Sequence, residues 1–311
     1  MPNRDTIVIG ASAGGVEALK ELVQHLPPDL PAAIFVVIHL YPRSGSVLPE
    51  ILSRSGPFSA IHPKNGTVIE HGRIYVAPPD HHLLIEPGHV HLGSGPKEQR
   101  QRPCINVTFR SAANSYRERV IGVLLTGQLD DGVAGLWHIK RHGGVAVVQN
   151  PEEAMFPSMP LSALREIETD YTLRLADMGS LFQRLVSEDG RSAGRSSNPS
   201  TDPQPHLTDL TCPDCRGNIW EVPKGRFTEY RCRVGHTYSP KSMLAEHFAA
   251  QEKALYAAIV ALEEGASLTH RLVEQVEPEV AERLRKEARE REAQAAQIRE
   301  MLKQRMSFSL D

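Results

Sequence analysis

The chain has 311 residues, 40% of them hydrophobic and 23% charged, which is enough for one sizeable globular domain and smaller units. A net charge of -3 gives no electrostatic reason to expect binding to nucleic acid or to an anionic membrane. The sequence has no apolar run long enough to span a bilayer, and we expect neither a signal peptide nor a membrane-embedded segment.

Residues 5 to about 185 alternate between strand-like and helix-like segments. We expect strands at Thr6–Ile9, Ile34–Ile38, Arg73–Ala77, His82–Ile85, Ile121–Leu125 and Val145–Val148. We expect helices at Val16–His25, Val47–Ser53, Ile105–Ser115, Val133–Arg141 and Leu161–Glu166. Uninterrupted apolar strands that alternate with helices predict an α/β fold with a doubly wound, mainly parallel sheet. Around Asp80–Gly88 the pattern favours a hairpin inserted into that scheme.

The stretch from Ile7 to Gly15 reads as a strand, a tight turn and the start of a helix. Its glycines allow a sharp turn, and a helix start offers unpaired N–H groups that favour negative charge. Ser12 in this turn is therefore a nucleophile beside an oxyanion site, a phosphate-binding residue or a turn residue. The phosphate interpretation is weakened because the stretch lacks the dinucleotide fingerprint and the Lys-Ser/Thr ending of a P-loop.

Three polar residues follow predicted strands: Ser12, His39 and Asp131. Ligands of open α/β sheets bind beyond the carboxyl ends of the strands, so these side chains converge if their strands are neighbours. Serine, histidine and aspartate are the types needed for a nucleophile, its general base and the group that orients the base. Taken singly, each has a structural alternative, such as a helix N-cap at Asp130–Gly132.

A metal-like pattern lies in the C-terminal part, where Cys212 and Cys215 precede Cys232 and His236. A C-x-x-C pair and a C-x-x-x-H pair supply three thiolates and one imidazole, a complete tetrahedral set for structural zinc with no open position for catalysis. The alternatives are free thiols or a redox C-x-x-C, which normally has a thioredoxin-like setting. This cysteine usage favours a reducing, cytoplasmic compartment. Cys104 is distant in sequence, and we expect it to be a small buried residue.

The last part of the chain is predicted to be two charged helices joined near Pro278. Their apolar stripes favour packing of one helix on the other, and self-association or docking on a helical receptor is the alternative. The apolar residues at helical spacing are Leu244, Phe248, Leu255, Ile259 and Leu262, then Val280, Leu284, Ala288, Ala295, Ile298 and Leu302. We expect a catalytic domain at 1–186, a flexible linker at 187–208, a zinc-ribbon-like unit at 209–242 and a helical hairpin at 243–306.

Several segments resemble the catalytic domain of the CheB-type family, the chemotaxis protein-glutamate methylesterases. They are Ile9–Gly15, His39, Ile74–Pro78, Arg102–Val107, Leu125–Gly132 and Met155–Pro160. The resemblance covers residues 5 to about 185. It implies hydrolysis of γ-methyl-glutamyl esters on the cytoplasmic helices of chemoreceptors, with release of methanol, and deamidation of certain receptor glutamines. It requires no cofactor for catalysis.

Carried over to this chain, the resemblance makes Ser12 the nucleophile, His39 the general base and Asp131 the residue that orients His39. Asp131 matches the family pattern because it immediately precedes a glycine. Backbone N–H groups near Ala13 and Gln128 would then stabilise the oxyanion. The positions expected beside the oxyanion or the substrate are Ala13, Gly14, Gln128 and Met159.

This chain departs from the family pattern at several positions. Ala13 stands where a threonine is usual, Gln128-Leu129 where Met-Gly is usual, and Asn106 where aspartate is frequent. Backbone donors are retained at Ala13 and Gln128, so we expect the chemistry to survive. Family members often carry a receiver domain ahead of the catalytic domain. Since this sequence starts with the catalytic strand, we expect no phosphorylation control within it.

Two hypotheses of other classes remain beside the hydrolase. One is a non-catalytic chemosensory module in which the α/β domain binds an anion or a partner. The other is a zinc-dependent nucleic-acid binder, which the near-neutral charge disfavours, so we expect no nucleic-acid partner. The presence of Ser12, His39 and Asp131 together favours the hydrolase.

Overall fold

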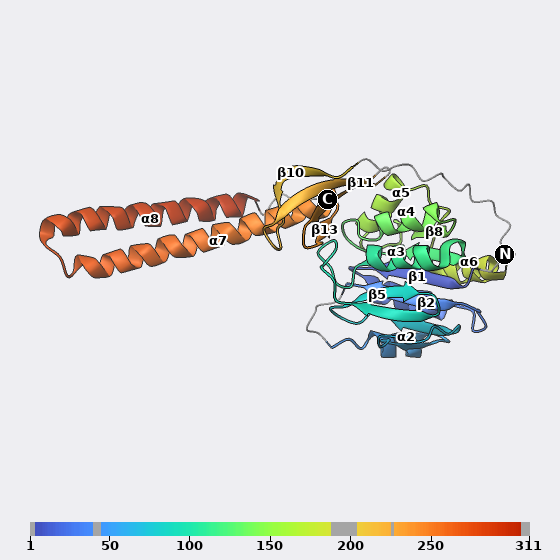
Figure 1. Cartoon of the computed structure of the whole chain (residues 1–311). Helices are drawn as coiled ribbons and strands as arrows, with labels where there is room; N and C mark the ends of the chain where they lie inside the picture. Colours follow the sequence, from blue (N-terminus) through green and yellow to red (C-terminus); the bar gives the residue numbers. More distant parts are fainter. Residues whose placement is uncertain (1–3, 40–44, 188–203, 225–226, 306–311) are drawn as a thin grey trace. The chain divides into compact units, whose positions relative to one another are not determined.

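The computed structural model describes residues 4–39, 45–187, 204–224 and 227–305 (Figure 1). The chain divides into two units, Met1–Met243 and Leu244–Asp311, and each is described by itself. Most of the predicted linker, residues 188–203, lies outside the described residues. Within the described ranges, no helix combines the length and the apolar character needed to cross a membrane.

The first unit is built on a seven-stranded sheet whose paired neighbours all run parallel, which confirms the predicted fold class. The strands, in spatial order, are β3 (Ser59–Ile61), β4 (Arg73–Val76), β2 (Ala33–Ile38), β1 (Thr6–Ala11), β7 (Val120–Leu124), β8 (Val145–Gln149) and β9 (Tyr171–Leu173). Every residue of β1, β2, β7 and β8 is buried, because helices cover both faces of the sheet. The short edge strands β3 and β9 were not predicted, since three residues carry no clear periodicity.

Successive residues of the strands feed two separate hydrophobic cores. Ile7 and Ile9 of β1 belong to one core, and Val8 between them belongs to the other. The first core contains side chains of α1 (Gly15–Gln24), α2 (Leu48–Ser55) and α6 (Leu175–Ser187). The second contains side chains of α3 (Ile105–Tyr116), α4 (Val133–Arg141) and α5 (Ser158–Glu166). A short 3-10 helix, Arg117–Arg119, leads from α3 into β7.

The hairpin expected in the middle of the chain is present. Strands β5 (His82–Glu86) and β6 (His89–Gly93) pair antiparallel, and Gly88 turns between them with a φ of 82°. The hairpin packs against α3, whose Thr108 hydroxyl donates a 2.7 Å hydrogen bond to the carbonyl of Leu83. This contact ties the hairpin to α3, whose side chains belong to the second core.

A second, antiparallel sheet completes the first unit. Its strands are β10 (His206–Thr211), β11 (Asn218–Lys224), β12 (Phe227–Cys232) and β13 (Thr237–Tyr238). The buried core of this sheet is small and consists of Cys212, Ile219, Cys232, Tyr238 and Met243. A core of this size supplies little hydrophobic stabilisation, which is typical of units that depend on a bound metal.

The second unit consists of most of α7 (Pro240–Val273) and of α8 (Pro278–Arg305). The two helices run antiparallel, because Glu263 pairs with Arg299 while His270 pairs with Glu292. Ile259, Ala295 and Leu302 form its buried core, with Leu255, Leu262 and Ile298 packed against them. Of the apolar residues predicted to face a partner helix, Leu244, Phe248 and Val280 are exposed.

The contact between α1 and α6 leaves no room for a side chain at Gly179. A Cβ atom there would lie 1.8 Å from the carbonyl oxygen of His25. We expect Gly179→Ala to lower the free energy of unfolding by about 1–3 kcal/mol, because the two helices would have to separate. Urea denaturation measures the change. Gly95→Ala is the matched control, since nothing lies within 4 Å of a Cβ at that position, and equal stability of both variants would contradict the expectation.

Candidate functional site

Ser12 lies in the turn between β1 and α1, beyond the carboxyl end of the central strand. Its backbone N–H donates a 3.0 Å hydrogen bond to the carbonyl of Thr126, which follows β7, so the two strand ends are tied together. Gly14 has a φ of 72°, a conformation that favours glycine and allows the sharp entry into α1. A Cβ at Gly127 would lie 2.9 Å from the Cβ of Ser12, so only glycine permits this close approach.

The structure brings the three sequence-predicted side chains into one hydrogen-bonded chain. His39 Nδ1 lies 2.9 Å from Ser12 Oγ, and His39 Nε2 lies 2.7 Å from Asp131 Oδ2. The side chains converge because β2 and β7 are the two neighbours of β1 in the sheet. With its proton on Nε2, the neutral imidazole donates to the carboxylate and leaves Nδ1 free to accept from the serine hydroxyl.

The Asp131 carboxylate is buried and accepts hydrogen bonds at the start of α3. Its partners there are the N–H of Ile105 at 2.8 Å, the N–H of Asn106 at 3.0 Å and the thiol of Cys104 at 3.2 Å. Burial raises the pKa of Asp131, but the bond to His39 and the two backbone donors outweigh it and hold the pKa below its usual value. The site therefore contains a buried aspartate that is ionised at neutral pH.

Asn106 and Cys104 were not predicted to have these roles. The Asn106 side-chain oxygen accepts from the N–H of Gly132 at 3.0 Å and of Gly135 at 2.7 Å, which fixes the loop that carries Asp131. Burial, together with the charge of Asp131, raises the pKa of the Cys104 thiol well above its usual value, so it stays a protonated donor. The one signal in the sequence was their place at a predicted helix start.

The positions expected near the oxyanion divide into two kinds. Among the described residues, no hydrogen bond from the backbone N–H of Ala13, Gly14 or Gln128 is present. The N–H of Met159, by contrast, donates to the carbonyl of Gly127, and its side chain is fully buried against that glycine. Met159 thus supports the turn, whereas the neighbouring Met155 is 64% exposed beside Gly14.

A family model described as CheB methylesterase matches residues 7–182, more than half of the chain. The chain belongs to this family. A Leptospira interrogans protein, provisionally named protein-glutamate methylesterase/protein-glutamine glutaminase, is 40% identical over 184 residues, which cover 59% of this chain and 95% of that protein. A Methanosarcina mazei protein named protein-glutamate methylesterase/protein-glutamine glutaminase 2 is 34% identical over 59% of this chain. The match spans about half (52%) of that relative's length.

The comparison of folds agrees with the family. The crystal structure of the Thermotoga maritima CheB methylesterase catalytic domain is similar with a TM-score of 0.56 and 30% identity. The similarity covers 60% of this chain and 100% of that domain. The CheB methylesterase domain of this protein is thus the part that carries Ser12, His39 and Asp131, and the antiparallel sheet of β10–β13 lies beyond the matched residues.

The cysteine cluster predicted from the sequence gathers at one end of that antiparallel sheet. The donor atoms of Cys212, Cys215, Cys232 and His236 all lie within 4.8 Å of one another. The sulfurs of Cys215 and Cys232 are 3.6 Å apart, and His236 Nδ1 lies 3.5 Å and 3.7 Å from the sulfurs of Cys232 and Cys212. These four side chains form a compact group of metal-binding type.

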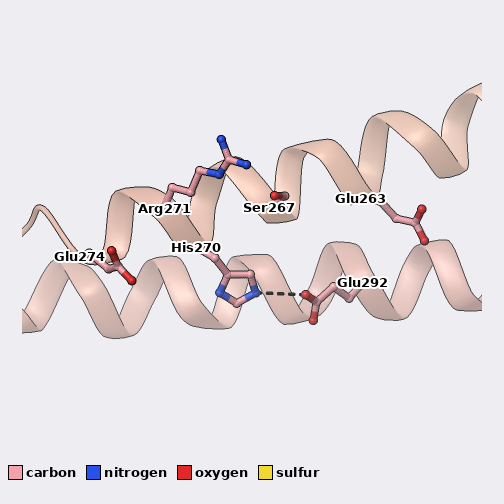
Figure 2. Close-up of a pocket in the computed structure, with 6 residues that line it drawn as sticks. All are labelled: Glu263, Ser267, His270, Arg271, Glu274 and Glu292. Carbon is pink, nitrogen blue, oxygen red and sulfur yellow. Dashed lines mark hydrogen bonds and ion pairs between the residues drawn. The ribbon is translucent and has the colours of Figure 1, made fainter.

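A shallow pocket of about 510 Å³ lies between α7 and α8 of the second unit (Figure 2). It is lined by Glu263, Ser267, His270, Arg271, Glu274 and Glu292. His270 and Glu292 hydrogen-bond at 3.0 Å across the two helices, as Figure 2 shows. Within the part of the chain that the structure describes, His270 and Glu292 are the one charge pair among these six residues, and Ser267 makes no hydrogen bond to His270 like that of Ser12 to His39. The site at Ser12 is therefore the stronger candidate.

Asp131 makes the stability of the fold depend on pH in acid. Its folded-state pKa lies below the ordinary value of about 3.9, so the unfolded chain takes up this proton first as the pH falls. The stability contributed by the carboxylate is complete above the ordinary value and is lost as the pH falls through the folded-state pKa. We expect the stability advantage of wild type over Asp131→Asn to shrink in that window, as measured by urea denaturation. If the free energies of unfolding of the two proteins fell equally with pH, this expectation would be contradicted.

Proposed function

We propose that the protein is a serine-type carboxylic-ester hydrolase, a protein-glutamate methylesterase that also deamidates glutamine side chains. The observation that carries this proposal is the hydrogen-bonded chain from Ser12 through His39 to the buried Asp131. Membership of the CheB methylesterase family and the names of the relatives support the same class of reaction. A purely binding module would have no need for an ionised aspartate buried behind a histidine.

In the proposed reaction Ser12 Oγ attacks the carbonyl carbon of a γ-methyl-glutamyl ester. The hydroxyl proton passes to His39 Nδ1, and the imidazolium is stabilised by Asp131 at Nε2. Collapse of the tetrahedral intermediate expels methanol, which takes the proton from His39. Water then attacks the acyl-serine with His39 again as base, which releases glutamate and regenerates the hydroxyl. With a glutamine substrate the same steps release ammonia.

The N–H groups of Ala13 and Gln128 are proposed as donors to the oxyanion. Both have no hydrogen-bond partner in the described part of the chain, and both lie in turns that meet at Ser12. Loss of one such donor costs about 3–4 kcal/mol of transition-state stabilisation in other enzymes. Because the donors are backbone groups, the departures from the family pattern at these two positions leave this function intact.

The proposed substrates are methylated glutamates on the cytoplasmic helices of chemoreceptors, which places the protein in the cytoplasm. A long, surface-exposed glutamyl ester suits a nucleophile at the carboxyl end of the central strand. Met155 is exposed beside Gly14 and offers an apolar contact for the substrate helix. The charged α8 and the exposed apolar residues of α7 provide the surface for self-association or receptor docking in this proposal.

We also propose that Cys212, Cys215, Cys232 and His236 hold a structural zinc ion. A tetrahedral zinc with Zn–S near 2.3 Å and Zn–N near 2.0 Å requires donor separations of about 3.5–3.8 Å. The separations of 3.5, 3.6 and 3.7 Å meet this requirement, and the sulfurs are too far apart for a disulfide. When bound, the ion would offset most of the charge of the thiolates and would join β12 to the turn before β11.

Replacement of the proposed nucleophile tests the reaction. We expect Ser12→Ala to abolish methanol release from methylated receptor membranes, and Asp131→Asn to lower kcat by about 10⁴-fold through loss of the correct imidazole tautomer. Ser55→Ala is the matched control, because in the described part of the chain that hydroxyl bonds only the carbonyl of Ile51 within α2. Full activity of Ser12→Ala would exclude Ser12 as the nucleophile.

Metal analysis tests the zinc proposal. We expect the purified full-length chain to hold one zinc ion, and Cys232→Ser to lose it together with the thermal stability of the β10–β13 sheet. Cys104→Ala should keep the ion, because Cys104 bonds Asp131 and lies outside the cluster. Zinc content that is unchanged in Cys232→Ser would refute this ligand set.

A further inference from the structure

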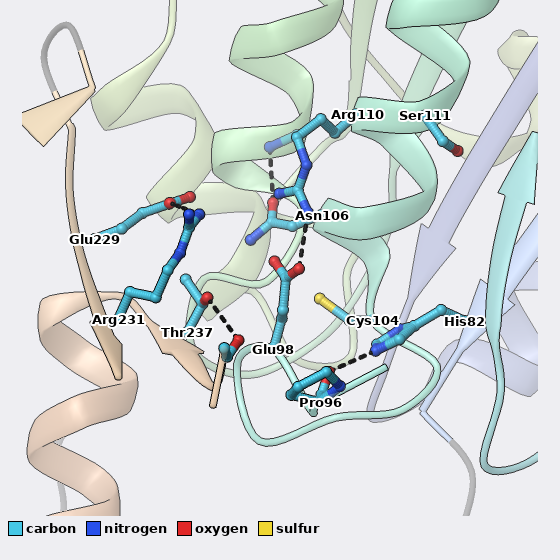
Figure 3. A network of polar contacts seen from close by, with 12 residues as sticks. His82, Pro96, Glu98, Cys104, Asn106, Arg110, Ser111, Glu229, Arg231 and Thr237 are labelled. Atoms are coloured by element: carbon cyan, nitrogen blue, oxygen red, sulfur yellow. Dashed lines mark hydrogen bonds and ion pairs between the residues drawn. The ribbon is translucent and has the colours of Figure 1, made fainter. Parts of the chain in front are cut away.

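Gln99 of the methylesterase domain is inserted into the antiparallel sheet unit that carries the cysteine cluster. Its side chain is only 6% exposed. Its N–H donates a 2.7 Å hydrogen bond to the carbonyl of Thr237, and its Oε1 accepts from the N–H of Ser239 at 3.0 Å and from the Ser242 hydroxyl. Figure 3 shows Thr237 facing the loop that carries Glu98, which bonds Arg110 of α3.

Two further side chains of the same segment reach the domain. The Ser239 hydroxyl donates a 2.8 Å hydrogen bond to Asp130, the residue directly before Asp131. Lys241 donates a 2.8 Å bond to the hydroxyl of Ser162, which donates in turn to the carbonyl of Leu129. We call Thr237–Ser242 the clamp segment. It contacts the loop just before the buried aspartate and, through Gln99, the loop that leads to the residues bonded to that aspartate.

The loops held by the clamp segment have backbone conformations that they would not prefer alone. Gln99, Arg100 and Leu129 have φ values of 51°, 70° and 62°, in the left-handed region that costs a residue with a side chain about 1 kcal/mol or more. Such conformations persist where surrounding contacts enforce them. The loop of Gln99 leads into Cys104–Asn106, which binds the Asp131 carboxylate. Both loops therefore end on the same carboxylate.

The clamp segment is built directly onto the cysteine cluster. Thr237 follows His236, and β13 pairs with β12 through Tyr230–Tyr238 and Arg231–Thr237. The N–H of Cys232 donates to the carbonyl of His236 at 3.1 Å. His236 is thus joined to Thr237 and Ser239 through the backbone and through the pairing of β13 with β12. An edge-to-face contact between Trp137 of α4 and Phe227 of β12, with centroids 5.5 Å apart, adds apolar contact between the two parts.

We propose that Ser239 and Lys241, together with the groups that bond Gln99, are positioning residues that hold in place the two loops ending on Asp131. Through them, the rate of hydrolysis depends on whether the cysteine cluster holds a metal ion. This inference rests on the proposed function. Among the described residues, no hydrogen bond joins the clamp segment to Ser12 or His39, and the segment acts through Asp130 and the loop of Gln99. It is a route by which a metal-binding unit outside the family match sets the activity of the site.

The test compares full-length Ser239→Ala with wild type in the methanol-release assay. We expect kcat to fall about tenfold with KM unchanged, because a misplaced aspartate affects the transition state more than substrate binding. Ser239→Thr, which keeps the hydroxyl, should restore most of kcat. Thr208→Ala is the matched control, since among the described residues this hydroxyl bonds only within the same antiparallel sheet.

A second readout does not need activity. Amide hydrogen exchange of the segments 99–106 and 126–132 should be faster in Ser239→Ala and in wild type stripped of metal by a chelator, and Zn²⁺ added back should restore protection only in wild type. Stripping should lower kcat in wild type and have little additional effect in Ser239→Ala, because both changes release the same loops.

The outcomes separate this inference from the proposed function. If wild type releases no methanol from any methylated receptor, the proposed function fails, and hydrogen exchange still tests the clamp. If wild type is active while Ser239→Ala equals Thr208→Ala in kcat and in exchange, the clamp is refuted and the hydrolase stands. A rise in KM at constant kcat would also refute it, since that pattern indicates lost substrate binding.

Discussion

The arrangement of the site depends on the hydrogen bonds that the buried carboxylate of Asp131 accepts. An ionised aspartate removed from water is strongly unfavourable unless hydrogen bonds replace its hydration. His39 and the N–H groups of Ile105 and Asn106 supply those bonds, and they come from the ends of β2 and from the start of α3. One carboxylate therefore joins segments that are far apart in the sequence and fixes their relative positions.

The order of the strands provides the second constraint. β1 lies at the centre with β2 and β7 beside it, so the chain crosses from one half of the sheet to the other at this point. Loops that leave neighbouring parallel strands here diverge to opposite faces and leave space for a ligand. Ser12, at the end of β1, occupies that space, while Gly127 allows the adjacent turn to come close to it. The chemistry proposed for the serine follows from this position.

Much of the domain was predictable because its signals are local. Apolar runs gave the central strands, and the glycine-rich turn after β1 indicated Ser12. The spacing of Cys212, Cys215, Cys232 and His236 indicated a cluster whose donor atoms do lie together. The roles of Cys104 and Asn106 were not predictable, since a residue that bonds a carboxylate 25 or 27 positions away leaves no periodic trace in the sequence. The short strands β3 and β9 were not predicted for a related reason: they form only by pairing with the edges of the larger sheet.

The sequence by itself determined the fold class, the family resemblance and the types of side chain available for chemistry, since these depend on periodicity and on short motifs. Only the tertiary structure decided which neighbours each side chain has. It gave Asp130, the neighbour of the predicted Asp131, to the hydroxyl of Ser239. It buried Met159 under Gly127 and left Met155 exposed. The physical reason is that hydrogen bonds and burial are set by atoms brought together from distant parts of the chain, and no local pattern specifies them.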